Sequence, residues 1–119
     1  MSSFKKRKLS GSTDGMPIKV VATATAGTTI HTAVAGTTAG TFDEIWLYGF
    51  NSSDTAVKLT IEYGGATAPD QNIEVTLAAE SRLQLIVPGL ILQNGLAVKA
   101  FAGTADVLTI SGWVNSITD

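Results

Sequence analysis

The sequence predicts an all-β fold, specifically a jelly-roll-like sandwich of two sheets with about eight strands and an extended N-terminal arm. Apolar and polar residues alternate with a period of two through most of the chain. Thr and Val are abundant, and turn residues, above all glycine, separate the alternating stretches. No stretch keeps a helical apolar stripe with capping signals at its ends.

Eight alternating stretches are the expected strands. They are Ile18–Thr25, Thr28–Ala35, Phe42–Phe50, Ala56–Tyr63, Asn72–Ala78, Ser81–Val87, Leu96–Ala102 and Val107–Ile117. The segment Leu90–Gln93 is either a short extra strand or a loop. One sequence does not give the strand order, so an immunoglobulin-like sandwich and a small barrel remain alternatives to the jelly roll.

The alternation also predicts which side chains face the core. We expect Val57, Leu59 and Ile61 to point inward and Lys58, Thr60 and Glu62 outward. The inward sets expected for later strands are Leu83, Leu85 and Val87; Leu96, Val98 and Ala100; and Leu108, Ile110 and Val114.

The length and composition indicate one domain with a modest core. The chain has 119 residues, of which 45% are hydrophobic and only 15% charged, well below the usual share of about a quarter. A surface built from Thr, Ser, Gly and Ala is typical of a protein packed in an assembly, although small free β domains can look similar. We expect no secretory signal, and no apolar run approaches the roughly 20 residues of a membrane span.

Charge is distributed unevenly and divides the chain into two predicted parts. Residues 1–16 form a basic arm with four bases and one acid, a sum of +3, whereas residues 17–119, the predicted sandwich, hold four bases and nine acids, a sum of −5. The arm is polar and should be disordered alone. We expect Phe4, Lys5, Lys6, Arg7 and Lys8 to bind a partner.

An acidic protein surface is the favoured partner of this arm. Nucleic acid is disfavoured, since the arm has no interleaved aromatic residue beyond Phe4 and the acidic body would repel phosphates. The remaining alternative is a solvated tail that aids solubility.

The predicted strand Phe42–Phe50 carries large side chains on both faces. Ile45 and Leu47 occupy one face, and aromatic residues occupy the other. A sandwich strand normally shows one face to water, so this second face needs a cover. We expect an interface with another copy of the chain, formed by Trp46, Tyr48, Phe50, Phe101 and Trp113. The alternatives are that a loop or the arm covers these residues, or that the register differs by one.

Residue types that carry catalysis or bind metals are sparse, so we expect no enzyme activity, no cofactor and no metal ion. His31 is the only histidine and there is no cysteine, which leaves neither a triad-like arrangement nor a usual zinc set. Asp43 and Glu44 are adjacent, so in a strand they point to opposite faces. Asn51 begins a formal glycosylation sequon, a match that is common by chance.

Three segments resemble small virion proteins of tailed bacteriophages in style and length. They are Ser10–Thr37 (SGSTDGMPIKVVATATAGTTIHTAVAGT), Asp43–Asn51 (DEIWLYGFN) and Leu108–Thr118 (LTISGWVNSIT). The resemblance covers most of the chain but brings no catalytic or binding motif. It implies a capsid decoration, or cement, protein, or a small component of the head–tail connection or tail. Decoration proteins of this kind are often jelly rolls that form trimers, with an N-terminal arm that grips the capsid.

The expected function is therefore a structural part of the virion, made in the host cytoplasm. We expect a homo-oligomer, a trimer on the resemblance, that binds the major capsid protein or another virion protein and stabilises the assembled shell. The alternatives are a tail or head–tail accessory protein, and a carbohydrate-binding sandwich on a tail fibre or spike, where the aromatic residues would be an exposed stacking platform.

Overall fold

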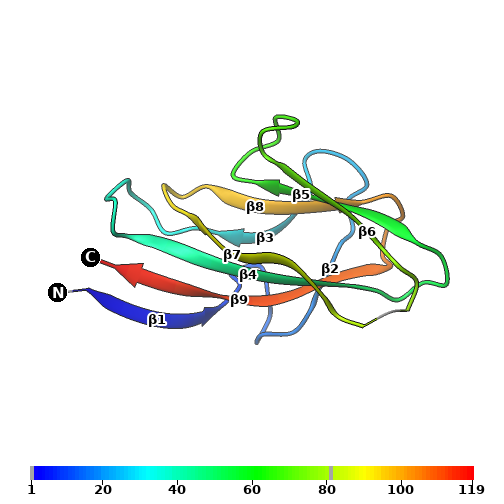
Figure 1. The fold of residues 1–119 in the computed structure, drawn as a ribbon, viewed down its shortest axis with the longest axis horizontal. Helices are drawn as coiled ribbons and strands as arrows, with labels where there is room; N and C mark the ends of the chain where they lie inside the picture. The colour runs from blue at the N-terminus through cyan, green and yellow to red at the C-terminus, as the bar shows by residue number, and fades with distance from the viewer. Residues whose placement is uncertain (1, 81) are drawn as a thin grey trace.

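The computed structural model describes residues 2–80 and 82–119, and the described residues form β-strands and no helix. The strands build two antiparallel sheets that pack as a sandwich, so the predicted all-β two-sheet fold is confirmed (Figure 1). The strands are β1 (Ser3–Lys8), β2 (Ile18–Lys19), β3 (Thr28–Thr32), β4 (Phe42–Asn51), β5 (Val57–Tyr63), β6 (Asn72–Leu77), β7 (Gln84–Leu92), β8 (Ala97–Ala102) and β9 (Leu108–Thr118).

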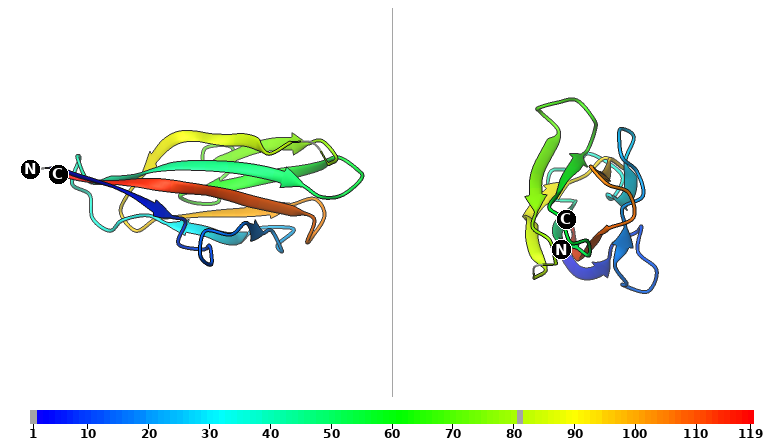
Figure 2. Two further views of the ribbon diagram at one scale, coloured as in Figure 1. Left: turned by 90° about the horizontal axis from the view of Figure 1, so that it is seen from below. Right: turned by 90° about the vertical axis from the view of Figure 1, so that its right-hand side faces the viewer.

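Strand pairing is nested along the chain. The first sheet, called sheet A, has the order β1-β9-β4-β7, with β2 also paired to β9; sheet B has the order β3-β8-β5-β6. The first strands therefore pair with the last, β3 with β8, β4 with β7, and β5 with β6. Seen end-on in Figure 2, the strands wrap around a common interior.

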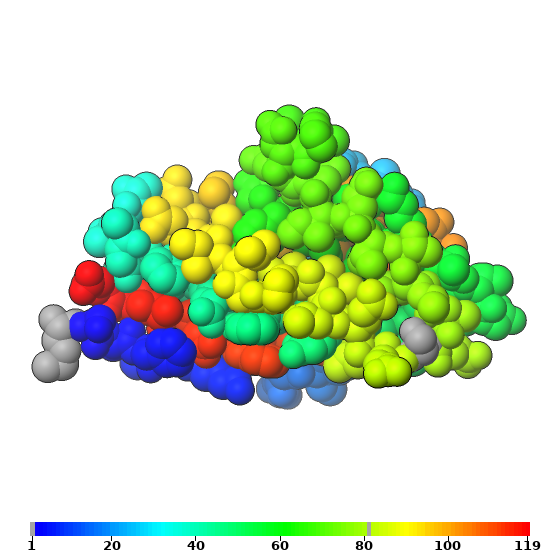
Figure 3. Space-filling view, viewed as in Figure 1, coloured from blue at the N-terminus to red at the C-terminus, as the bar shows by residue number. Residues whose placement is uncertain are grey.

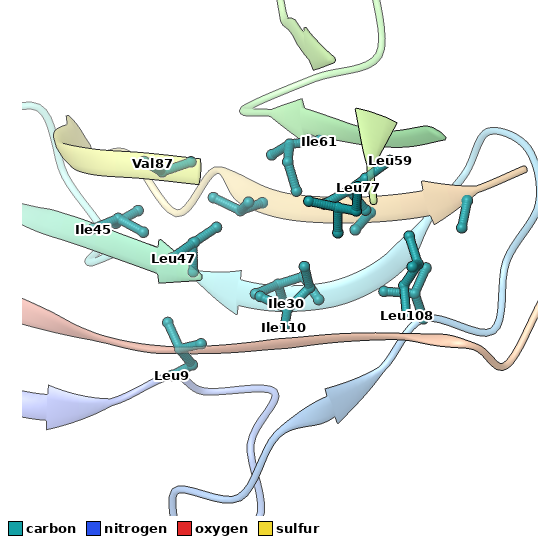
Figure 4. Close-up of a cluster of buried hydrophobic side chains, with 14 of the residues drawn as sticks. Leu9, Ile30, Ile45, Leu47, Leu59, Ile61, Leu77, Val87, Leu108 and Ile110 are labelled. Atoms are coloured by element: carbon teal, nitrogen blue, oxygen red, sulfur yellow. The ribbon is translucent and has the colours of Figure 1, made fainter. Parts of the chain in front are cut away.

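The interior is filled by alternate side chains of both sheets. In β4 every second residue is buried, including Ile45 and Leu47, and in β5 Leu59 and Ile61 are fully buried as expected (Figure 4). The cluster comprises Leu9, Val20, Ile30, Ile45, Leu47, Val57, Leu59, Ile61, Leu77, Val87, Val98, Ala100, Ala102, Leu108, Ile110 and Val114. Burial of this apolar surface is the main favourable contribution to folding.

The N-terminal segment lies on the sandwich and does not project as a free arm. Residues 3–8 pair with β9 along their length, as the blue and red strands in Figure 3 show side by side. Leu9 is 1% exposed and points into the core (Figure 4), and the Gly11 amide donates to the Ile30 carbonyl oxygen. Backbone pairing with β9 and burial of Leu9 oppose the disorder expected from the local composition.

Strand β7 departs from the expected one. It continues through Pro88 and Gly89, where an end was expected, and includes most of Leu90–Gln93. The expected start at Ser81 lies outside the described residues. Register shifts against β4 lie between Ile45 and Trp46 and between Leu47 and Tyr48. Of the expected inward set, Val87 is buried, whereas Leu85 is 44% exposed and Leu83, which precedes β7, is 49% exposed.

Two further expectations are wrong: the length of the strand expected at Ile18–Thr25 and the inward position expected for Leu96. Within the stretch Ile18–Thr25 only Ile18–Lys19 forms a strand. Its continuation folds over the outside of sheet B, where the Thr25 hydroxyl and the Gly27 amide donate to the Glu62 carboxylate, both at 2.7 Å. This loop explains why Glu62 is buried although its strand position faces outward. Leu96, expected inward, lies before β8 and is 41% exposed.

Replacing Leu9 by Ala should lower the free energy of unfolding by about 2–5 kcal/mol, because the truncation leaves a cavity in the shared core. The control is Phe4→Ala in β1, which should change it by less than about 0.5 kcal/mol, since Phe4 is 64% exposed. Denaturant unfolding measures both values. Equal, small effects would show that the N-terminal segment is not part of the folded unit.

Candidate interaction surface

A row of four residues crosses sheet A on the face that points away from sheet B. We call this face the outer face and the row the cross-strand row. In strand order it consists of Lys6, Trp113, Trp46 and Gly89. The indole rings of Trp46 and Trp113 stack with centroids 5.8 Å apart and planes 13° apart. The Lys6 ammonium lies 4.5 Å from the Trp113 ring centroid, a cation–π geometry.

Gly89 closes the row at the β7 edge. Its φ is +81°, and a Cβ placed on it would lie 2.8 Å from Cζ2 of Trp46. Trp46 is thus held between Trp113 on one side and the backbone of Gly89 on the other. Tyr48 also stacks on Trp113, with centroids 5.9 Å apart. The ring faces therefore pack against neighbours within the chain, which does not suit a platform for stacking a sugar or a base.

Glu44 supplies a fixed negative charge beside the row. Its Oε1 accepts hydrogen bonds from Nδ2 of Asn115 at 2.9 Å and from Nε1 of Trp46 at 2.8 Å. These two bonds, the Asn115 bond first, hold the pKa of Glu44 below its ordinary value of 4.5, and partial burial opposes them. The carboxylate orients the Trp46 ring and remains ionised at neutral pH.

Aliphatic side chains extend the outer face along β7. Leu85 pairs with Tyr48 and Ile91 with Glu44, and they are 44% and 56% exposed. At the other end, Phe4 and Phe42 flank Ile117 on β9. Aromatic and aliphatic side chains thus occupy much of the outer face on β4, β7 and part of β9. The polar residues that interrupt them are Lys6, Lys8, Glu44, Thr109, Ser111 and Asn115.

The structure brings four of the five predicted interface residues together. Trp46, Tyr48, Phe50 and Trp113 lie on the outer face, and each is partly exposed. Phe101 lies on the outside of sheet B, opposite Thr60, and is separate from the others. Whether these residues form an interface stays a prediction.

The basic residues lie on both sides of β1, and all are exposed. Lys6 and Lys8 share the side of the outer face, because they pair with Asn115 and Trp113. Lys5 and Arg7 point to the opposite side. One argument against nucleic acid, that the basic segment lacks neighbouring aromatic residues, does not hold in three dimensions, because Lys6 lies on Trp113.

His31 belongs to a buried hydrogen-bond network that the sequence did not reveal. Its Nε2 lies 2.7 Å from Asp43 Oδ2, and its Nδ1 accepts a hydrogen bond from the Ser10 amide at 3.0 Å. The amide donor fixes the tautomer, so Nε2–H donates to Asp43. The Ser116 hydroxyl donates to Asp43 Oδ1 at 2.8 Å. Because the hydroxyl contacts the acid and not the imidazole, this is not the order of groups that activates a nucleophile.

The alternation of side chains in β4 could have predicted that Asp43 is buried. Asp43 has the same parity as Ile45 and Leu47, so it had to point inward, and it is 3% exposed. A buried carboxylate requires donors. The network links β3, β4 and β9 to the segment that follows β1.

Asn51 is not available as a glycosylation acceptor. It is 1% exposed, and its Nδ2 donates to the carbonyl oxygens of Thr55 and Leu77 at 2.8 and 3.0 Å. Within residues 2–80 and 82–119, His, Asp and Glu side chains form no group of three or more that could hold a metal ion.

Comparisons with known proteins return nothing: no family model, no curated protein and no solved structure matches this chain. Over the described part of the chain, no helix is long and apolar enough to cross a membrane.

Gly89→Ala tests the closing contact of the cross-strand row. The control is Gly95→Ala, since Gly95 has a φ of +66° and open space around it. Left-handed strain alone should cost the control about 1–2 kcal/mol of unfolding free energy. Gly89→Ala should cost a further ~1–3 kcal/mol, because the new methyl group displaces Trp46. If both variants lost the same unfolding free energy and kept the near-UV circular dichroism of the wild type, the packing of Trp46 against Gly89 would be contradicted.

Glu44→Gln tests the carboxylate beside the row through the pH dependence of stability. A pKa lowered by folding adds stability that is complete above the ordinary value of 4.5 and is lost as the pH falls through the folded value. The variant should therefore lose less unfolding free energy than the wild type between neutral pH and acid. Asp70→Asn removes one loop carboxylate as a control. Identical pH profiles of stability for Glu44→Gln and the wild type would refute the stabilising role of the Glu44 carboxylate.

Proposed function

We propose that this chain is a structural protein of a virion, specifically a capsid decoration protein that stabilises an assembled shell as a symmetric homo-oligomer, a trimer. The observation that carries the proposal is the apolar outer face of sheet A. Contiguous apolar surface on a β-sheet is typical of an interaction site, since isolated exposed side chains are ordinary but continuous patches are not.

The rigidity of the outer face supports an interface function. The rings of Trp46 and Trp113 are fixed by stacking, by the bond to Glu44 and by the backbone of Gly89. Side chains that are already ordered lose little conformational entropy on binding, and aromatic residues are enriched in interface centres. A second copy that covers Leu85 and Ile91 would remove them from water.

The strand order supports the jelly-roll assignment. If β1 and β2 are taken together as the first strand, the eight strands form four nested antiparallel pairs, from first-with-last to the central pair β5 and β6. Wrapping such a nested hairpin gives two four-stranded sheets, the arrangement of a jelly roll.

A tail or head–tail accessory protein would use the same surfaces, so the partner distinguishes it from a decoration protein. The third candidate, a carbohydrate-binding module, receives less support. It needs free ring faces, whereas Trp113 has Lys6 and Trp46 as neighbours across the sheet. A monomer whose Trp fluorescence is quenched by oligosaccharides would favour that module over the proposal.

The mass in solution tests the oligomer. We expect a trimer by light scattering for the wild type and a monomer for Ile91→Glu, because a carboxylate would be buried unpaired in the interface. The matched control is Val21→Glu, since Val21 is 54% exposed but lies outside the strands; it should remain a trimer. A monomeric wild type, or equal masses for the two variants, would overturn the outer-face interface.

A further inference from the structure

Strand β1 has a free backbone edge. It pairs with β9 on one side, and within residues 2–80 and 82–119 no strand pairs with its other side. The β7 edge is less suited to strand addition, because Pro88 lacks an amide hydrogen and the strand has two register shifts. The β3 edge is partly covered, since Gly11 and Ser10 bond to Ile30 and Thr32. Of the remaining edges, β1 and β6, only β1 is strongly cationic.

The cations of β1 differ in what they contact. The Lys6 ammonium lies on Trp113, and Lys8 Nζ donates to the Ser12 carbonyl oxygen at 3.0 Å. Lys5 and Arg7, on the opposite side of the strand, have no ion pair or side-chain hydrogen bond with the described residues. These two charges are therefore available to an external carboxylate.

Arg7 faces a groove between β1 and β3. The groove has a volume of about 450 Å³, and the hydroxyl-bearing residues Ser10, Thr32, Ser116 and Thr118 are among those that line it. The charged or titratable groups that line it are Arg7, Lys8, His31 and Asp43. Asp43, which is 3% exposed, already accepts hydrogen bonds on its carboxylate from His31, Ser116 and the Val34 amide. The groove thus presents the cationic groups of Arg7 and Lys8 beside a buried acid whose oxygens are already hydrogen-bonded.

We propose that an acidic, extended segment of another protein adds to the free edge of β1 and places its carboxylates against Lys5 and Arg7, with the Arg7 contact in the groove. Strand addition supplies backbone hydrogen bonds, and alternate side chains supply the specificity. A second copy of β1 is a poor occupant, because four cations would then face four cations. The identity of the partner as a virion protein rests on the proposed function; the binding mode does not.

Two synthetic peptides separate strand addition from simple charge attraction. The first has about eight residues of alternating Glu and Thr, long enough to span β1. The second has Pro in place of every Thr, so it keeps the charge but loses the backbone donors at those positions. Titration calorimetry on the full chain, at one ionic strength, should detect binding of the Thr peptide and at least about tenfold weaker binding of the Pro peptide.

Two charge-matched variants locate the carboxylates. Lys5→Gln with Arg7→Gln should weaken Thr-peptide binding at least about tenfold, because charge-assisted hydrogen bonds are lost. Lys6→Gln with Lys19→Gln removes the same charge from two exposed residues that do not line the groove, and should weaken it less than about threefold. All four side chains are exposed, so both variants should fold, which far-UV circular dichroism checks.

Equal binding of the two peptides, equal effects of the two variants, or displacement of the Thr peptide by a single-stranded oligonucleotide would overturn the proposal. Light scattering on the same samples distinguishes a failure of the strand-addition proposal from a failure of the proposed oligomer. If the protein is a trimer that does not bind the Thr peptide, strand addition alone is refuted. If it is a monomer that binds the Thr peptide as expected, only the proposed oligomer is refuted.

Discussion

The two-sided packing of β4 is the constraint on which the rest of the structure depends. This central strand of sheet A sends Ile45 and Leu47 into the core and Trp46 and Tyr48 to the outer face. The period of two makes these sets inseparable, since a shift by one residue would bury the indole and expose the aliphatic pair. The outer face is therefore apolar because of the same register that forms the core.

The N-terminal segment contributes to both sheet A and the core. Strand β1 completes sheet A beside β9, and Leu9 fills the core just beyond it. Ser10 is then tied to β3 twice, through His31 Nδ1 and through the Thr32 amide. The basic segment is thus displayed in a defined orientation, and a fixed strand loses less entropy on binding than a flexible tail.

Two surfaces of different chemistry meet along β1. The outer face is apolar and suits a copy of the same chain, whereas the opposite side of β1 is cationic and suits an acidic partner. Lys6 lies on the outer-face side, where its ammonium contacts Trp113, whereas Lys5 and Arg7 lie on the opposite side. The proposed self-association and the proposed partner binding therefore use separate sides of one edge.

The sequence by itself determined the strands whose alternation is regular, the inward set of β4 and β5, and the separation of Trp46 from Ile45, because side-chain direction in a strand is a local property. Tertiary structure decided what depends on distant partners. Pairing with β9 ordered a basic segment that local composition marks as disordered, and the bulges opposite β4 turned Leu85 outward. The approach of His31 to Asp43 and the placement of Phe101 on the other sheet likewise follow from strand order, which no local pattern encodes.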